Sequence, residues 1–392
     1  MKDRGILIKN GALITPEGIL PDTDLLIKGT KISRIGKALL TRQKDRKDIQ
    51  VVDAFKHYVS PGLIDIHIHG ADGVIFGVCD REEINRVTRI LAKYGVTGFL
   101  PTIQSLPSKT LMKALERLKD SKDIIDNGAE MLGVHLEGPM INPARAGAHK
   151  KEYLRNLRPQ EISRFQKVSG GLIKLMTLAP ELPGAMKIIR HLRKCGIISA
   201  AGHSEASFQQ MQLAIQNGLT HIIHLYNAMR GIHHRQPGIL ESALLMDELS
   251  VEIICDGIHL ALPAIQLVLK CKPLDKIILI TDSVGLNLDP GNTFRYDKAK
   301  YIVKDGAVWI KKTGKLGGSS ISLLQAVKNL TQWIKLPLYQ IIRMASLNPA
   351  RIIGLDKRIG SLEPGKDATL LILDKQLNVR ETFIRGRSVW KS

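Results

Sequence analysis

The chain has few cysteines and few aromatic side chains for its length. Of its 392 residues, four are cysteine and 4% are Phe, Trp or Tyr. The cysteines lack the Cys-x-x-Cys spacing of a redox or zinc motif. The charged start MKDRGILIKN has no apolar run of secretory length, so we expect a cytoplasmic protein with reduced thiols. The cysteines are Cys79, Cys195, Cys255 and Cys271.

Long apolar runs and acidic residues are also scarce. No segment approaches the roughly 18 uninterrupted apolar residues of a membrane helix, so we expect no membrane span. The chain has 37 acidic against 57 basic residues, a formal charge of +20. Nucleic-acid binding is one explanation of that charge, but the basic residues are spread along the chain and base-stacking aromatic residues are few. We therefore interpret the charge as a solvated lysine-rich surface that attracts anionic small molecules.

The middle of the chain repeats one pattern. Eight short β-branched runs end in polar residues, and an amphipathic helical stretch follows most of them. Strands alternating with helices predict an α/β fold with a parallel sheet, and eight of them predict a (β/α)₈ TIM barrel. A doubly wound open sheet is the alternative, but no G-x-G-x-x-G turn is present. The runs span residues 62–70, 95–103, 131–138, 172–181, 196–204, 219–227, 251–259 and 276–283.

The two ends of the chain depart from this pattern in the same way. Residues 1–58 and 355–392 contain short strand-like runs that are broken by glycine turns. We expect both ends to pair into one small β-domain beside the barrel. The remaining residues, 59–354, would then form the barrel as a catalytic domain.

The first run, GLIDIHIHG, contains two imidazoles two residues apart. Because side chains alternate along a strand, His67 and His69 point to the same face, where they can hold a metal or be ordinary structural residues. Five further strands also end in His, Glu or Asp. In a barrel these carboxyl ends meet at one rim, where catalytic groups gather. The further strand-end residues are His135, Glu137, His203, His224, His259 and Asp282.

Several longer motifs are more specific than His-x-His. They are PGLIDIHIHG, GVHLEGP, GHS, HLYNAM, HRQPG, DGIH, TDS and LGGSS. With these motifs the chain resembles the amidohydrolase superfamily, and within it the N-acetylglucosamine-6-phosphate deacetylases, along nearly its whole length. The resemblance implies hydrolysis of N-acetyl-D-glucosamine 6-phosphate to D-glucosamine 6-phosphate and acetate, in amino-sugar catabolism and cell-wall recycling. It also implies a homodimer and the terminal β-sandwich.

The resemblance further implies a divalent metal site. Glu137, His203 and His224 match the family's metal-binding set, and His67 and His69 match the superfamily's second-metal pair. One or two ions per subunit are expected, with Glu137 bridging if both are bound, although the second pair can also persist without an ion. Zn²⁺ is the first expectation and Fe²⁺ the second, because site geometry and metal supply decide occupancy.

Catalytic and substrate-binding roles are likewise implied by the motif match. Asp282 would take the proton of the attacking water and pass it to the leaving amine, while a strand-end cap or a plain metal ligand are the alternatives. His149 would hydrogen-bond the acetyl carbonyl. Arg235 would bind the phosphate in a bidentate fork and can reach across from a neighbouring subunit. The other implied substrate contacts are Asn227, Ala228, His259, Leu316, Gly317 and Gly318.

Other functions stay open at this point. An N-acetylgalactosamine-6-phosphate deacetylase differs at one sugar hydroxyl, and Met140, where the family has an aromatic residue, leaves sugar and acyl preference undecided. Other barrel amidohydrolases, such as an adenine deaminase or a dihydroorotase, would not need HLYNAM or Arg235. A basic nucleic-acid-binding or inactive regulatory relative is the non-enzyme alternative. His191, His221 and His233 are expected to be structural or exposed.

Overall fold

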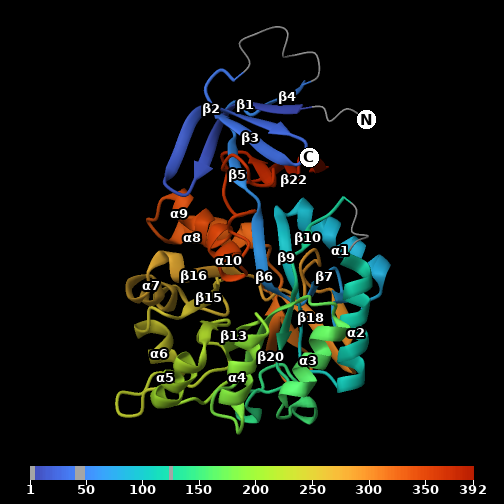
Figure 1. The fold of residues 1–392 in the computed structure, drawn as a ribbon, viewed down its shortest axis with the longest axis vertical. Helices are drawn as coiled ribbons and strands as arrows, with labels where there is room; N and C mark the ends of the chain where they lie inside the picture. The colour runs from blue at the N-terminus through green and yellow to red at the C-terminus, as the bar shows by residue number, and fades with distance from the viewer. Residues whose placement is uncertain (1–4, 40–48, 123–126) are drawn as a thin grey trace.

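In the computed structural model, which describes residues 5–39, 49–122 and 127–392, eight parallel strands form a barrel in the middle of the chain (Figure 1). Each strand pairs with the next one in the chain, and a short strand, β10 (Glu130–Met131), also pairs with β9. The predicted barrel and its eight strands are confirmed. The strands are β6 (Leu63–Ile68), β9 (Val96–Ile103), β11 (Val134–Glu137), β12 (Ile173–Leu178), β13 (Ile198–Ala201), β14 (Leu219–Ile222), β15 (Ser250–Ile254) and β16 (Ile277–Ile280).

Hydrogen bonds between the first and last strands bring the barrel close to closure. The N–H of Asp282 donates to the carbonyl of His67 and the N–H of His69 to the carbonyl of Ser283, each at 2.9 Å. Between the same strands, Thr281 Oγ1 donates to Asp65 Oδ2 at 2.6 Å, and both residues are buried. This seam places the two histidines of the first strand beside the acid that follows the eighth.

Helices cover the outside of the barrel. Helix α1 begins in a capping box, in which Asp80 accepts from Glu83 N–H and Glu83 accepts from Asp80 N–H, both at 2.9 Å. No helix among the described residues is long and apolar enough to cross a membrane. The helices are α1 (Arg81–Lys93), α2 (Ser108–Ser121), α3 (Pro159–Val168), α4 (Ala185–Lys194), α5 (Phe208–Asn217), α6 (Ile239–Leu245), α7 (Leu262–Cys271), α8 (Leu323–Trp333), α9 (Leu338–Met344) and α10 (Leu347–Ile352), with 3₁₀ turns at Pro143–Arg145, Lys151–Tyr153 and Leu274–Lys276.

The two ends of the chain form one eight-stranded sheet, drawn at the top of Figure 1. A strand from the C-terminal end, β21, pairs antiparallel with β5, and β5 pairs with β1, so the predicted strand-rich unit from both termini is confirmed. Ile8, Leu25 and Phe383 are fully buried in its core. Its strands are β1 (Gly5–Thr15), β2 (Gly18–Lys28), β3 (Lys31–Gly36), β4 (Ile49–Asp53), β5 (Tyr58–Pro61), β21 (Leu370–Leu373), β22 (Val379–Ile384) and β23 (Arg387–Lys391).

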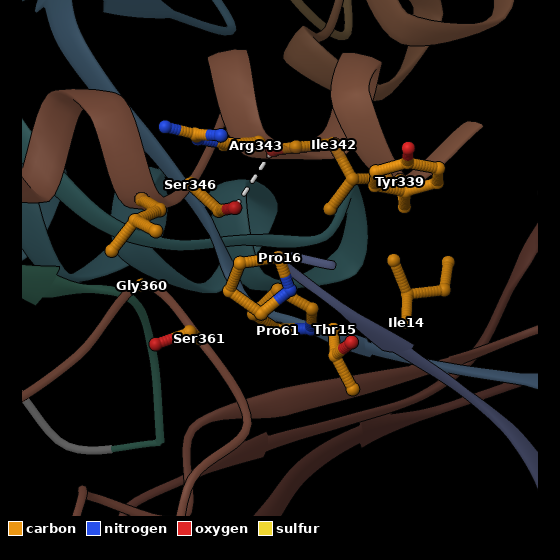
Figure 2. Close-up of a pocket in the computed structure, with 11 residues that line it drawn as sticks. Ile14, Thr15, Pro16, Pro61, Tyr339, Ile342, Arg343, Ser346, Gly360 and Ser361 are labelled. Carbon is orange, nitrogen blue, oxygen red and sulfur yellow. Dashed lines mark hydrogen bonds between the residues drawn. The ribbon is translucent and has the colours of Figure 1, made fainter. Parts of the chain in front are cut away.

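The terminal sheet lies at the amino ends of the barrel strands, away from the predicted rim, because β5 runs into β6 through Gly62. A Cβ on Gly62 would come within 2.1 Å of Thr97 Oγ1, so only glycine fits this junction. Figure 2 shows where Pro16 and Pro61 face Ser346 and its neighbours from α9 and the start of α10. The cavity there measures about 10 Å³, so the two parts pack closely and leave no room for a substrate.

An antiparallel four-stranded sheet follows β16, and the sequence analysis did not predict it. Val303 and Val308 form its buried core with Val284, which comes just after the eighth barrel strand. Its strands are β17 (Thr293–Tyr296), β18 (Ala299–Lys304), β19 (Ala307–Ile310) and β20 (Lys315–Ser319), and a two-stranded hairpin, β7 (Gly70–Ala71) with β8 (Val74–Ile75), follows β6.

The Asp65–Thr281 bond predicts a measurable stability effect at the barrel seam. In Thr281→Val the buried Asp65 carboxyl loses its hydroxyl donor, and the N–H of Ser283 loses the oxygen it contacts at 3.1 Å. A buried polar group left without a partner costs about 1–3 kcal/mol. We therefore expect the free energy of unfolding of Thr281→Val, measured in urea, to be lower by about that amount. The matched control is Thr293→Val on an exposed strand position, which should change stability by less than about 0.5 kcal/mol. Equal unfolding curves for the two variants would contradict the role of the seam.

Candidate metal and catalytic site

Glu137, at the end of β11, lies at the centre of a buried histidine cluster. Its Oε1 is 3.0 Å from Nε2 of His203 and 3.1 Å from Nε2 of His224. Its Oε2 is 3.2 Å from Nε2 of His69 and 3.1 Å from Nε2 of His149. Glu137 is only 3% exposed, and a carboxylate buried this deeply needs charged or hydrogen-bonding partners. The barrel therefore gathers residues from the first, third, fifth and sixth strands around one carboxylate.

A second group overlaps the first on the side of the barrel seam. Asp282 Oδ1 lies 3.2 Å from Nε2 of His69 and 3.6 Å from Nε2 of His67. His67 Nε2 is also 3.7 Å from Glu137 Oε1, yet it is buried without a hydrogen-bond partner. The structure therefore brings together all five predicted metal ligands, and it adds Asp282 and His149 to the same cluster.

The backbone bends sharply where three of these side chains leave their strands. His203, His224 and Asp282 each stand two residues past a strand end, with φ of +49°, +24° and +49°. Such left-handed conformations cost side chains other than glycine about 1–3 kcal/mol and persist where the surroundings impose them. All three residues have the same position relative to their strand and the same left-handed backbone, which turns their side chains toward the centre of the rim.

Hydrogen bonds to the far nitrogens fix the orientation of the rings. His203 Nδ1–H donates to the Arg145 carbonyl at 2.8 Å, which leaves its Nε2 lone pair facing Glu137. His149 is oriented in the opposite sense, because its Nδ1 accepts from Ser105 N–H at 3.2 Å. A neutral His149 therefore carries its proton on Nε2, and the hydrogen-bond network thus assigns different tautomers to His203 and His149.

Burial and charge set the protonation of the two acids. Burial alone would raise the pKa of Glu137, but the surrounding histidines, His149 first, hold it well below its usual range. Burial would likewise raise the pKa of Asp282, and the hydrogen bond from His69 together with nearby imidazoles lowers it to about 2. Both acids are therefore ionised at neutral pH, as metal ligands and proton acceptors need to be.

The histidines divide into two classes. Burial lowers the pKa of His149 to about 4, so it is neutral near pH 7. Burial also disfavours charge on His67 and His69, but the nearby carboxylates outweigh it. The pKa of His67 rises to about 9, chiefly through Glu252, and that of His69 to about 10, chiefly through Asp282 and Glu137. His67 and His69 are therefore protonated near pH 7, and a bound metal cation would be stabilised by the same carboxylates.

The donor set fits a divalent cation. His203 Nε2 and His224 Nε2 lie 3.1 Å apart, and two lone pairs this close repel unless a proton or a cation separates them. The buried, unpartnered Nε2 of His67 points to the same requirement. Imidazole nitrogens combined with carboxylates suit zinc or iron better than magnesium or calcium, which prefer oxygen ligands.

The predicted substrate residues lie around this cluster with one exception. Gly318, on β20, lies against Asp282: a Cβ there would be 2.7 Å from the Asp282 carbonyl, which accepts from Ser319 N–H at 2.9 Å. Leu316 and Gly317 precede it on the same strand, and a Cβ on Gly317 would be 3.0 Å from Tyr301 Cε1. The loop before His149 lies over the other side, because a Cβ on Gly147 would be 3.1 Å from the His203 ring and 3.7 Å from Ala228 Cβ.

His259 and Asn227 are half-buried near the rim. His259 Nδ1 lies 2.6 Å from Asp256 Oδ2; burial lowers the pKa of His259, and this carboxylate raises it overall. Asn227 Nδ2 donates to the carbonyl of Leu225 at 3.2 Å. The exception is Arg235, which is exposed and donates to His234 Nε2 at 2.9 Å. The single chain does not bring Arg235 into the cluster.

Residues that the sequence analysis missed support the ones it found. Glu252 contacts His67, Ser105 contacts His149, and Asp256 contacts His259. An acidic residue inside the apolar run SVEII was a usable indication of Glu252, because such residues are rarely buried without a partner. His135, predicted at the rim, instead contacts Thr177 Oγ1 at 2.8 Å within the barrel. His221 is buried, whereas His191 is half-buried and His233 exposed.

Comparisons with known proteins agree with this geometry. Residues 58–389 match the amidohydrolase family. The chain is 35% identical over 330 residues to an N-acetylglucosamine-6-phosphate deacetylase of Vibrio furnissii, covering 84% of this chain and 82% of that protein. It is 33% identical over 375 residues to an N-acetylgalactosamine-6-phosphate deacetylase of Escherichia coli O157:H7, covering 96% and 97%.

Solved structures give the same result. The crystal structure of N-acetylglucosamine-6-phosphate deacetylase from Pasteurella multocida matches with a TM-score of 0.91 and 29% identity, covering 99% of this chain and 100% of that one. The resemblance read from the motifs is thus confirmed by whole-chain similarity in sequence and in fold. With its barrel, its terminal sheet and its rim of histidines and acids, the chain belongs to the amidohydrolase family.

Proposed function

We propose that this chain is a metal-dependent hydrolase that removes the N-acetyl group of N-acetylglucosamine 6-phosphate, giving glucosamine 6-phosphate and acetate in amino-sugar catabolism and cell-wall recycling. The observation that carries the proposal is the convergence of Glu137, His203 and His224 with Asp282 and His149 at one rim of the barrel. The deacetylase relatives named above support the substrate class.

Glu137, His203 and His224 would hold one divalent ion, and His67 and His69 would hold a second beside Glu137 and Asp282. We propose Zn²⁺ first and Fe²⁺ second, because these ions accept mixed imidazole and carboxylate ligands. When bound, such an ion supplies Lewis acidity, which lowers the pKa of a water from about 15.7 toward about 7.

Asp282 is the proposed general base. Its carboxylate is ionised, since its pKa is about 2, and the bend at φ +49° turns it into the cluster. It accepts a proton as the water oxygen bonds to the acetyl carbon, and it delivers that proton to the nitrogen as the carbon–nitrogen bond breaks. The second proton of the water, which stays on the oxygen bonded to the acetyl carbon, also ends on the amine, so the products are acetate and the protonated amine and the protons balance.

His149 is the proposed donor to the acetyl oxygen. Because Ser105 N–H occupies its Nδ1, its proton is on Nε2, which lies 3.1 Å from Glu137 Oε2 and is the group that would donate to a substrate carbonyl entering the cluster. Negative charge builds on that oxygen during attack, and a hydrogen bond to it is worth more in the transition state than in the ground state. Removing one such donor typically costs about 10²–10³ in kcat.

For the phosphate we propose Arg235, His259, Asn227 and the main chain of Ala228, and for the sugar Leu316, Gly317 and Gly318. Arg235 is exposed, and its guanidinium contacts His234 Nε2 and no carboxylate among the described residues, so its charge is available to an anion. We propose that it reaches the site of a second subunit in a homodimer. Ile232, which is 56% exposed in the same loop, supports an intersubunit contact there.

The remaining parts of the proposal concern organisation and location. We propose residues 1–58 with 355–392 as one domain and 59–354 as the other, since the terminal sheet has an apolar cluster of its own around Ile8, Leu25 and Phe383, while Ile14 and Leu371 join it to the larger cluster of the barrel. We also propose a cytoplasmic location. The free thiols of Cys79 and Cys255, both buried, support a reducing compartment.

Substrate comparison tests the proposal most simply. Purified protein is supplied with N-acetylglucosamine 6-phosphate, its galactosamine epimer and unphosphorylated N-acetylglucosamine, and acetate release is measured. Hydrogen bonds to a charged group contribute about 1.5–3 kcal/mol each, so the phosphorylated sugar should have a kcat/KM at least about 10-fold higher than the free sugar. Equal turnover of both would remove the phosphate argument, and faster turnover of the epimer would favour the galactosamine enzyme.

Asp282→Asn tests proton transfer. The amide keeps the size of the side chain but cannot accept the proton, so kcat should fall by about 10²–10⁴ while the ion held by Glu137, His203 and His224 is retained. Asp275→Asn, at the opposite end of the same strand and exposed, is the matched control and should leave kcat unchanged. Near-normal turnover by Asp282→Asn would refute the assignment.

The raised pKa values of His67 and His69, about 9 and 10, predict proton release on metal binding. At pH 7.5 the metal-free fold holds both rings protonated, whereas the ordinary value of about 6.5 leaves them neutral in the unfolded chain. Their contribution to metal-free stability is thus present below pH 6.5 and lost as the pH rises through 9–10, and metal affinity should rise over that range.

Calorimetric titration of the metal-free protein with Zn²⁺ in two buffers of different ionisation enthalpy measures the released protons. His69→Ala should release about one proton fewer, because the variant lacks one of the two protonated rings. The same proton release from the variant and the unmodified protein would contradict this assignment.

A further inference from the structure

Glu252 is a fully buried acid that the proposed chemistry does not use. It lies in the middle of β15, between Val251 and Ile253, and has 0% exposure. An isolated charge at such a position would be strongly destabilising, so the fold must supply partners for it. These partners are His67 and His224, which belong to the histidine cluster described above, and His221, which lies next to that cluster.

Each carboxylate oxygen of Glu252 is engaged. Oε2 accepts from His67 Nδ1–H at 2.7 Å and from the main-chain N–H of His224 at 3.2 Å. Oε1 accepts from His221 Nε2–H at 3.0 Å. Glu252 therefore touches one residue from each of the two proposed ligand sets, although 185 residues separate it from His67.

His221 holds the other side of the carboxylate. It lies on β14, is fully buried, and has its Nδ1 at 2.7 Å from Ser250 Oγ. Ser250 Oγ in turn donates to the Thr220 carbonyl at 3.2 Å. All of these residues stand on barrel strands, so the position of the Glu252 carboxylate is fixed by regular structure and not by a loop.

The contact with Glu252 decides which nitrogen of His67 faces the site. With Nδ1–H donated to the carboxylate, Nε2 is the nitrogen left to bind an ion once its proton is released, and this atom lies 3.6 Å from Asp282 Oδ1 and 3.7 Å from Glu137 Oε1. It is buried and has no hydrogen-bond partner. Glu252 Oε2 also accepts a hydrogen bond from the main-chain N–H of His224, and this bond stabilises the left-handed backbone that turns His224 toward Glu137.

We propose that Glu252, backed by His221, is a positioning residue that orients His67 and His224 for metal binding and thereby sets the affinity of the site. The inference rests on the proposed metal-dependent function. Outer partners of this kind commonly change metal affinity by about 10–100-fold when they are removed. His221, without a role in the sequence analysis, gains one as the support of Glu252.

The chemistry of the amide makes Glu252→Gln a sharp test. An amide has one acceptor oxygen and an NH₂ group, so it cannot accept from both His67 Nδ1–H and His221 Nε2–H. If His67 moves its proton to satisfy the amide, the proton lands on the nitrogen that should bind the ion. Because the size of the side chain is unchanged, packing is preserved.

The experiment titrates metal-free protein with Zn²⁺ against a competing chelator and records the visible spectrum of the Co²⁺-loaded protein. Glu252→Gln should bind Zn²⁺ about 10–100-fold more weakly and change the Co²⁺ spectrum, since ligand orientation changes. His221→Gln should also weaken Zn²⁺ binding, but by a smaller factor than Glu252→Gln. The control, Glu381→Gln, removes another buried carboxylate, in the terminal sheet, and should leave both readouts unchanged.

Two further outcomes keep the test decisive. If Glu252→Gln does not fold, Glu252→Asp retains the charge but withdraws it from His67, and it should also weaken Zn²⁺ binding. Zn²⁺ affinity within twofold of the unmodified protein, with an unchanged Co²⁺ spectrum, would overturn the inference for either variant. No substrate enters this assay, so a protein that binds Zn²⁺ but releases no acetate would refute the proposed function and leave this inference standing.

Discussion

The structure depends on keeping one ionised carboxylate buried among imidazoles. Glu137 is nearly inaccessible to water, and four histidine nitrogens lie within 3.2 Å of its two oxygens. A nearly closed ring of parallel strands meets this requirement, because it brings strand ends from distant parts of the chain to one rim. The left-handed bends after three strands then direct side chains inward, and their backbone strain is offset by the contacts they make.

Outside the cluster, each element has a definable task. The seam between β6 and β16 sets His67 and His69 beside Asp282, and β20 lies against Asp282 from the other side. The terminal sheet packs at the opposite end of the barrel, so it stabilises the molecule without approaching the chemistry. Glu252 orients the His67 ring, and the Arg145 carbonyl orients the His203 ring, each through the nitrogen that faces away from the cluster. Function is thus distributed between residues that would touch a ligand and residues that aim them.

Much of this could be predicted from the sequence, and the failures have physical causes. The barrel strands are β-branched runs with polar ends, so local pattern was sufficient to find them and Glu137, His203 and His224 at their ends. The β17–β20 sheet escaped because short, half-exposed strands such as Thr293–Tyr296 carry little periodicity. The apolar run around Glu252 indicates that this acid is buried, but its contact with His67, 185 residues away, could not be predicted, because a hydrogen bond across a barrel has no signature in the local sequence. Arg235 belongs to an exposed loop, and the phosphate-binding role proposed for it depends on a second chain or a bound anion, which one sequence does not describe.

The central claim is that Glu137, His203 and His224 jointly hold a divalent ion. A crystal structure of the Zn²⁺-loaded protein, with anomalous scattering recorded at the zinc edge, tests it directly. We expect an anomalous peak about 2.0–2.2 Å from a carboxylate oxygen of Glu137 and from the Nε2 atoms of both histidines. Zinc bound elsewhere, or these three side chains turned away from one another, would contradict it.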